Sequence, residues 1–281
     1  MTRADRPYQH PGLAFLQQYG SLQTEADLFH YVEFLRRSAG MSPTEGALPI
    51  DLSPIFAHFG MPVPLRVPLD DQQGILLDSE TGVILIRAGD PIERQRFTEG
   101  HELMELLFDA QDQVNQELNL PPWDADRKEK LCDAGAAELL MPKYRFQKHL
   151  QHLGTSLETG RTLSRLYQTS WMATLIRMVQ LTAGEHALIF WTAVSNAEGD
   201  RLRSDWSVVS PEWQKGFIPK SFFIPAHELI PNRRPNRKPN QILKGRSNRS
   251  LELDDFRFVG RIEVAQMNGR SFSGVITLLH G

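Results

Sequence analysis

The segment between residues 73 and 108 limits the fold of this chain more than any other. Two short runs of β-forming residues, 73–77 and 83–87, are joined by a turn and predict a pair of strands. A long helix is expected next, because Asp90 suits an N-cap, Pro91 suits the first helical position and Glu93 is placed to close a capping box. Apolar residues then recur at helical spacing, so one face of this helix should be buried. Strands combined with long helices predict an α+β fold.

The same helix carries His101, Glu102 and Glu105, whose spacing points to metal chemistry. Residues four apart lie one turn apart on the same face, so His101 and Glu105 can bind one cation. Glu102 projects to the flank of that face, where it can reach a metal-bound water and act as general base. In the usual H-E-x-x-H pattern of zinc peptidases both outer residues are histidines. Here a glutamate replaces the second histidine, so a cation would meet one imidazole and one carboxylate.

A second helix offers a third ligand. Its start signals lie at residues 123–126 and Pro142 is expected to end it. Glu129 and Asp133 share one face of this helix, so Glu129 is the expected third ligand and Asp133 is expected to support a ligand by a hydrogen bond. Cys132 on the same face is interpreted as a small apolar residue that fills space. Without the flanking motifs, Glu105 and Glu129 would be interpreted as ordinary solvated carboxylates.

The residues of both helices resemble a known family. The segments are Arg96-Phe97-Thr98-Glu99-Gly100-His101-Glu102-Leu103 and Ala136-Ala137-Glu138-Leu139-Leu140-Met141-Pro142, and they are similar to the two motif helices of the ImmA/IrrE family of bacterial metallopeptidases. The resemblance extends over residues 20–180 and implies a zincin-like core. It implies that His101 and Glu129 are zinc ligands, that Glu102 is catalytic, and that Glu105 stands in the place of the second zinc histidine. Gly135 also departs from the family pattern, because a phenylalanine is usual there.

The resemblance implies a cytoplasmic metal-dependent endopeptidase of regulatory type, which cleaves a partner protein such as a helix-turn-helix repressor in a stress response. Two carboxylates and one imidazole nearly neutralise a divalent cation, which makes it a weaker Lewis acid. An oxygen-rich set also favours Mn²⁺ or another hard ion, although glutamate is an accepted Zn²⁺ ligand. Three alternatives stay open: a zinc enzyme, an enzyme with another metal, and a degenerate pseudo-peptidase that binds a partner without cutting it. A metal-dependent enzyme is favoured, because the general base and two ligands are present and the replacement can itself bind metal.

The predicted strand at residues 83–87 comes directly before the metal helix. An extended peptide can bind to the edge of a sheet through backbone hydrogen bonds. Val83, Leu85 and Arg87 of this strand are therefore expected to contact the substrate.

The rest of the chain predicts a helical connector and a β-rich region. Helices are expected at residues 157–167 and 171–181, and the second is too apolar to suggest a DNA-reading helix. Short β-type runs follow at residues 187–193, 206–209, 222–224, 256–264 and 271–279. The predicted organisation is a metallopeptidase-like core at residues 1–155, a helix-turn-helix-like connector at 156–183 and a smaller β-rich C-terminal domain at 184–281, which would act as a sensor or docking module.

One basic segment interrupts the β-rich region. Residues 231–240 repeat a proline-asparagine-basic unit that contains Arg233, Arg234, Arg237 and Lys238. Prolines at this spacing favour an extended, exposed segment. Such a segment can contact nucleic acid phosphates or an acidic partner, which makes a nucleic-acid-binding regulator a further alternative. A solvated loop is the favoured interpretation.

Composition argues against several other classes of protein. The chain has 281 residues, one cysteine and a formal charge of −3, so neither a disulfide framework nor a general attraction to nucleic acid is expected. The N-terminus lacks the apolar segment of a secretory signal, and no run approaches the roughly 20 apolar residues of a membrane helix. The expected location is the cytoplasm, without a membrane partner.

Overall fold

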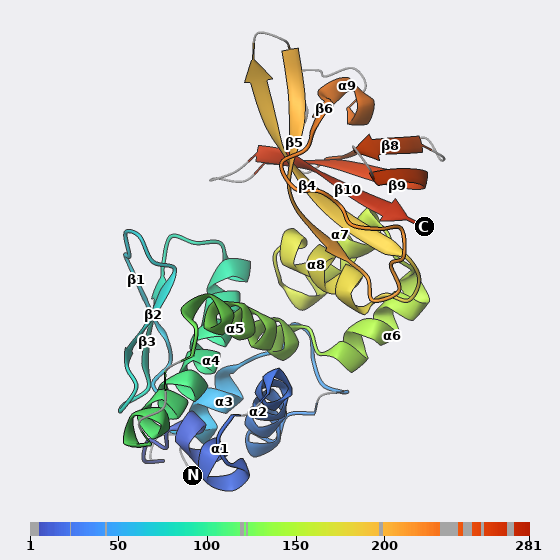
Figure 1. The fold of residues 1–281 in the computed structure, drawn as a ribbon. Helices are drawn as coiled ribbons and strands as arrows, with labels where there is room; N and C mark the ends of the chain where they lie inside the picture. The colour runs from blue at the N-terminus through green and yellow to red at the C-terminus, as the bar shows by residue number, and fades with distance from the viewer. Residues whose placement is uncertain are drawn as a thin grey trace. The chain divides into compact units, whose positions relative to one another are not determined.

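The computed structural model has an α+β fold, which confirms the predicted fold class (Figure 1). It describes residues 6–22, 24–42, 44–118, 121, 123–196, 199–230, 241–243, 249–253, 256–268 and 273–281. The chain divides into two compact units: Met1–Arg145 with Ser164–Ser170, and Phe146–Leu163 with Trp171–Gly281. The functional division at residues 155 and 183 stays a prediction. Within the described ranges, no helix combines the length and the apolar character that crossing a bilayer requires.

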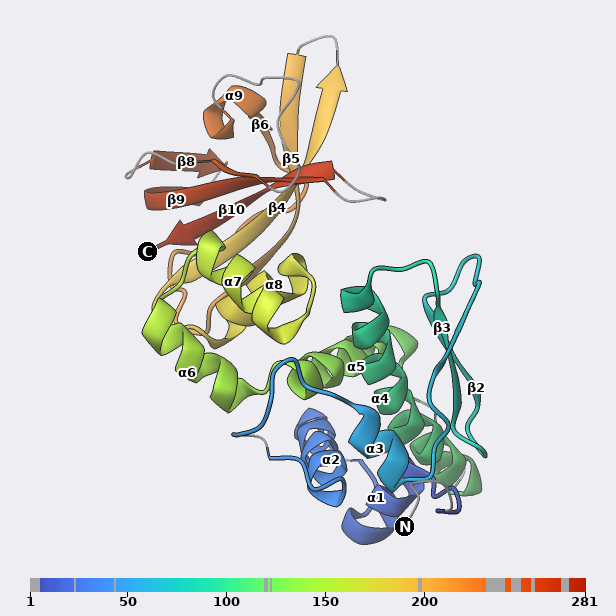
Figure 2. The same cartoon turned by 180° about the vertical axis from the view of Figure 1, so that it is seen from behind.

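The first unit is built around one long helix, α4. Its elements are α1 (Pro11–Tyr19), α2 (Glu25–Ser38), α3 (Ser53–His58), β1 (Leu65–Val67), β2 (Gly74–Asp78), β3 (Val83–Arg87), α4 (Ile92–Glu117) and α5 (Ala125–Leu140). Figures 1 and 2 show the three strands on one side of α4 and α2 on the other. The helix is therefore covered along most of its length, and residues such as Leu103, Met104 and Phe108 are fully buried. The predicted capping box at Asp90 does not form, because Pro91 is the N-cap of α4 and a proline has no backbone N–H to cap.

Helices α4 and α5 approach each other closely because small residues line their contact. A Cβ atom on Gly135 would lie 2.3 Å from Met104 Sδ, and a Cβ atom on Gly100 would lie 3.3 Å from Ala136 Cα. A phenylalanine at position 135 would not fit against Met104. The glycine at this position therefore explains how α5 comes close enough for its side chains to reach those of α4.

The small sheet has the strand order β1-β3-β2, with β1 parallel and β2 antiparallel to β3. Strand β3 therefore lies in the centre and its backbone pairs on both sides. The expectation that residues 83–87 bind a substrate by edge pairing is wrong for this topology. Strand β1 was not predicted from the sequence, because only three residues lie between Pro64 and Pro68.

The second unit contains a large antiparallel sheet with helices packed on it. Its elements are α6 (Lys143–Leu153), α7 (Leu157–Tyr167), α8 (Trp171–Leu181), β4 (His186–Asn196), β5 (Gly199–Val209), β6 (Phe223–Pro225), α9 (Ala226–Leu229), β7 (Gln241–Leu243), β8 (Arg249–Leu253), β9 (Phe256–Asn268) and β10 (Ser273–His280). The start of α6 and the end of α7 belong to the first unit. The strand order is β6-β5-β4-β10-β9-β7, and β8 pairs with β9. Inside the sheet, Trp191 donates a hydrogen bond to Thr277 Oγ1 at 3.0 Å, which satisfies its buried indole N–H.

Several sequence predictions can be compared directly with these elements. The ends of α7 and α8 agree with the predicted ranges, and β9 and β10, which pair antiparallel, overlap the predicted runs 256–264 and 271–279. Helix α6 was not predicted, because Pro142 was interpreted as a stop signal, although a proline directly before a helix removes none of that helix's backbone hydrogen bonds. The basic segment with Arg233, Arg234, Arg237 and Lys238 lies outside the described residues.

Candidate metal centre

The three predicted ligands lie close together between α4 and α5. His101 Nε2 is 3.8 Å from Glu105 Oε1 and 3.6 Å from Glu129 Oε2. Two ligand atoms of tetrahedral zinc, each about 2.0–2.1 Å from the ion, are about 3.3 Å apart. His101 Nε2 is therefore within about 0.5 Å of the separation that zinc requires from each glutamate, whereas the ligand atoms that all lie within 4.8 Å of one another are those of His101, Glu105 and Cys132. His101 and Glu105 are largely buried, whereas Glu129 is exposed at the rim.

Asp133 orients the histidine from the other side of the ring. Its Oδ1 lies 3.0 Å from His101 Nδ1, and since an ionised carboxylate only accepts, Nδ1 carries the proton. In the neutral ring the lone pair of Nε2 faces the two glutamates. Burial alone would lower the pKa of His101, but the hydrogen bond to Asp133 and the nearby carboxylates raise it overall.

Glu102 lies beside this group of ligands and is buried. Burial raises the pKa of its carboxyl to about 7, and the charge of Glu105 adds to this effect. The positive charge available on His101 and a hydrogen bond from the backbone of Leu76 act in the opposite direction. A carboxyl that titrates near neutral pH is suited to accept and return a proton, as a general base must.

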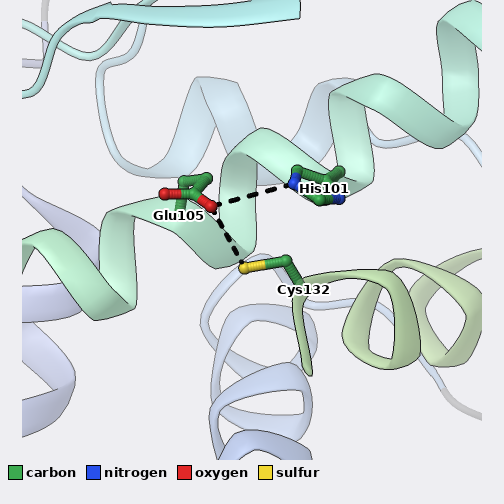
Figure 3. A group of neighbouring side chains, drawn as sticks. All are labelled: His101, Glu105 and Cys132. Carbon is green, nitrogen blue, oxygen red and sulfur yellow. Dashed lines mark hydrogen bonds and ion pairs between the residues drawn. The ribbon is translucent and has the colours of Figure 1, made fainter. Parts of the chain in front are cut away.

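Glu105 has two further partners that sequence reasoning did not assign to it. The ammonium of Lys128 lies 2.5 Å from Glu105 Oε2, and the thiol of Cys132 donates to Oε1 at 3.4 Å. Figure 3 shows the carboxylate of Glu105 in contact with both His101 and Cys132, and these three side chains offer ligand atoms within 4.8 Å of one another. Cys132 is therefore more than a space-filling residue. Burial raises the pKa of its thiol, which keeps it protonated as a donor in the metal-free site.

Strand β2, rather than β3, presents a sheet edge beside Glu102. The Glu102 carboxylate accepts a hydrogen bond from the backbone of Leu76 on this strand. A Cβ atom on Gly74 would lie 2.7 Å from Glu102 Oε1, so the strand and the helix are as close as a glycine allows. The predicted substrate contacts Val83, Leu85 and Arg87 are half-buried on the central strand β3.

Comparisons with known proteins agree on the kind of domain that carries this site. Residues 58–179 match the model of the IrrE N-terminal-like domain of peptidase family M78. The radiation response metalloprotease IrrE of Deinococcus deserti is 36% identical over 104 residues, which are 36% of this chain and 35% of that protein. The protein of the same name from Deinococcus radiodurans is 30% identical over 120 residues, which are 41% of this chain and 35% of that protein. The chain thus spans about a third of the length of both relatives.

A comparison of folds extends further along the chain. A transcriptional regulator from Mycobacterium tuberculosis superposes with a TM-score of 0.56 over 95% of this chain and 92% of its own length, at 14% identity. This likeness shows a common fold that includes both compact units.

Proposed function

We propose that this chain, which carries a peptidase domain of the ImmA/IrrE family over residues 58–179, is a metal-dependent endopeptidase of regulatory type. One observation carries the proposal. His101 Nε2 faces the oxygens of Glu105 and Glu129 at 3.8 and 3.6 Å while Asp133 holds the opposite ring nitrogen. The proposed substrate is a partner protein, such as a helix-turn-helix repressor.

The ligands fit a divalent cation, and Zn²⁺ is the ion we propose for them. His101, Glu105 and Glu129 would hold it, and when bound it would polarise the scissile carbonyl and acidify a water molecule. Asp133 keeps the proton on Nδ1 of His101, so that Nε2 stays available as a ligand. Mn²⁺ is the alternative, because two of the three ligand atoms are oxygens.

The remaining roles belong to Glu102 and to strand β2. Glu102 takes a proton from the attacking water and returns it to the departing amine, which is the task of a general acid and base. The edge of β2 beside Glu102 would hold the substrate in an extended form through backbone hydrogen bonds. This arrangement brings a peptide carbonyl next to the ligands.

Substitution of Glu102 tests the catalytic role. Glu102→Gln is expected to keep metal at the wild-type stoichiometry and to lose cleavage by at least about a hundredfold, because general base catalysis contributes that much. Elemental analysis gives the metal content, and mass spectrometry of a proteome-derived peptide library gives the cleavage. Glu117→Gln is the matched control, since it makes the same change at an exposed position on α4. A Glu102→Gln protein that cleaves as fast as the wild type would refute this role.

A non-catalytic regulator that binds a partner protein is the second candidate, and one observation favours it. Both carboxylate oxygens of Glu105 already have donors, from Lys128 and Cys132, so this group is satisfied without a metal. His101→Ala and Glu105→Ala separate the two functions. Stoichiometric metal that is lost in both variants, together with cleavage of the peptide library by the wild type, supports the peptidase. A wild-type protein that stays metal-free after reloading, or that binds metal without cleaving, supports the regulator.

A further inference from the structure

The two oxygens of Glu105 face different neighbours. Oε2 is held by the ammonium of Lys128 at 2.5 Å, whereas Oε1 is the atom that faces His101 Nε2. The side chains of Glu105 and Lys128 are 17% and 25% exposed, so this ion pair is shielded from most of the solvent. A shielded ion pair holds its geometry better than an exposed one, because fewer water molecules compete for either partner.

Lys128 also adds a positive charge that the proposed metal centre would otherwise lack. Two imidazoles and one carboxylate around a divalent cation leave one net positive charge. When a glutamate replaces the second imidazole, the ligands and the cation sum to zero. The ammonium of Lys128, in contact with that same glutamate, brings the group back to one positive charge.

We propose that Lys128 is a positioning residue of the metal centre, which holds Oε2 of Glu105 so that the carboxylate offers only Oε1 to the cation. This inference rests on the proposed function. Lys128 would then do for Glu105 what Asp133 does for His101. Both residues lie on α5, on either side of the ligand Glu129, so one helix supplies a ligand and the two groups that orient the others.

A carboxylate that presents one oxygen to the cation, after the weak contact of that oxygen with the Cys132 thiol is exchanged for the metal, restricts the choice of metal. A ligand that contributes one atom suits four-coordinate Zn²⁺, whereas a carboxylate that binds through both oxygens raises the coordination number. Sites richer in oxygen ligands suit Mn²⁺ better. Removal of Lys128 therefore frees Oε2 as a further ligand and shifts the preference away from zinc.

Cobalt(II) substitution tests the inference, because its visible absorption is strong in four-coordinate sites and weak in sites of higher coordination. The full chain is loaded with Co²⁺ as wild type, Lys128→Met and Lys128→Arg, and competition with a chelator gives the Kd values for Zn²⁺ and Mn²⁺. In Lys128→Met we expect a weaker visible band and a Kd ratio shifted toward Mn²⁺ by about tenfold, the lower end of effects from groups that orient ligands. Lys128→Arg keeps the charge and is expected to keep the wild-type spectrum.

Two further variants make the result decisive. Lys130→Met removes an exposed lysine from the same helix and is expected to behave as wild type. Lys128→Ala replaces Lys128→Met if the latter does not fold. An unchanged spectrum and an unchanged Kd ratio in a folded Lys128 variant, with a wild type that binds Co²⁺ at one per chain, overturn the role of Lys128 alone. A wild type that binds no Co²⁺ overturns the proposed function, and this inference with it.

Discussion

The side chains that contact the proposed ligands determine which ligand atom is available to a cation. Asp133 fixes the ring of His101, and Lys128 fixes the carboxylate of Glu105. Neither orienting residue needs to touch the ion. A substitution at either position should therefore change metal binding while the ligands themselves remain.

Asp133 gives a prediction at this scale. Asp133→Ala removes the acceptor from Nδ1 of His101, and we expect the affinity for Zn²⁺ to fall by about 10- to 100-fold, as is typical when such a partner is lost. Asp133→Asn keeps an acceptor oxygen and should stay close to wild type. Chelator competition measures both affinities, with Asp126→Ala as an exposed control on the same helix. Equal affinity in wild type and Asp133→Ala would remove Asp133 from the site.

Part of the candidate site could be predicted from residue spacing and part could not. The spacing of His101 and Glu105 within one helix predicted a shared face, and the structure brings their side chains together. The contacts of Lys128 and Cys132 with Glu105 depend on how closely α5 crosses α4. That distance is set by Gly135, whose neighbour Met104 is 31 residues away in the sequence. Spacing within one helix carries no information about such a contact, and the roles of all these residues stay predictions.

At the scale of the secondary structure elements, β2 packs closely against α4 and thereby holds the Glu102 side chain in place. In Gly74→Ala, the added Cβ would lie 2.2 Å from Thr98 Cγ2 and 2.7 Å from Glu102 Oε1, so the strand and the carboxylate must move apart. We expect cleavage to fall by about a hundredfold, the cost of a small misplacement near the reacting atoms, while metal content is kept. The measurement is cleavage of the peptide library together with elemental analysis. Gly89→Ala, where a Cβ meets no atom within 4 Å, is the control, and equal losses in both variants would contradict the prediction.

In the second unit, Glu263 joins strand β9 to the start of α7. Its Oε2 accepts a hydrogen bond from the backbone N–H of Leu157 at 2.8 Å, and its Oε1 pairs with His280 and Arg261. Burial alone would raise the pKa of Glu263, but these partners lower it overall. Because the folded-state pKa lies below the unfolded value, this stabilisation is present above the unfolded pKa of about 4.3 and is lost as the pH falls through the folded pKa.

Glu263→Gln tests this anchor. We expect the variant to lose about 1.5–3 kcal/mol of unfolding free energy at pH 7, the range for hydrogen bonds to a charged group, and the difference to shrink below about pH 4. Urea unfolding at both pH values measures it. Glu252→Gln, which alters an exposed pair with Arg257, should change little at either pH. A difference between Glu263→Gln and wild type that stays constant with pH would show that the charge of Glu263 does not stabilise this unit.

Some helices and strands could be predicted from the sequence and others only in part, and the differences have physical reasons. Strand β3 and helices α7 and α8 have clear apolar periods and agree with the predicted ranges. Strand β5 begins seven residues before the predicted run 206–209, because residues such as Asp200, Arg201 and Arg203 hide the strand pattern although Leu202 between them is buried. The central place of β3 could not be predicted, since β1 is too short to give a pattern and its partner lies about 20 residues away along the chain.

At the scale of the molecule, the described residues form two separate hydrophobic cores. One includes Leu103, Phe108 and Leu139 and lies in the first unit, and the other includes Trp191 and Phe258 and lies in the second. A compact unit with its own core can unfold as its own cooperative unit. A cation bound by His101, Glu105 and Glu129 would belong to the first unit alone, so its stabilisation should appear in the unfolding of that unit.

Calorimetry of the full chain with and without Zn²⁺ tests this arrangement. We expect two transitions, of which only one gains stability from the metal, by about 2.7 kcal/mol when free Zn²⁺ is 100 times its Kd. His101→Ala should abolish that gain and leave the other transition in place. Phe258→Ala, which empties a buried position of the second core, should lower only the metal-independent transition by about 3–5 kcal/mol. If Zn²⁺ and Phe258→Ala instead shift one common transition, the two units unfold together, and metal binding would then stabilise the β-rich unit as well as the peptidase domain.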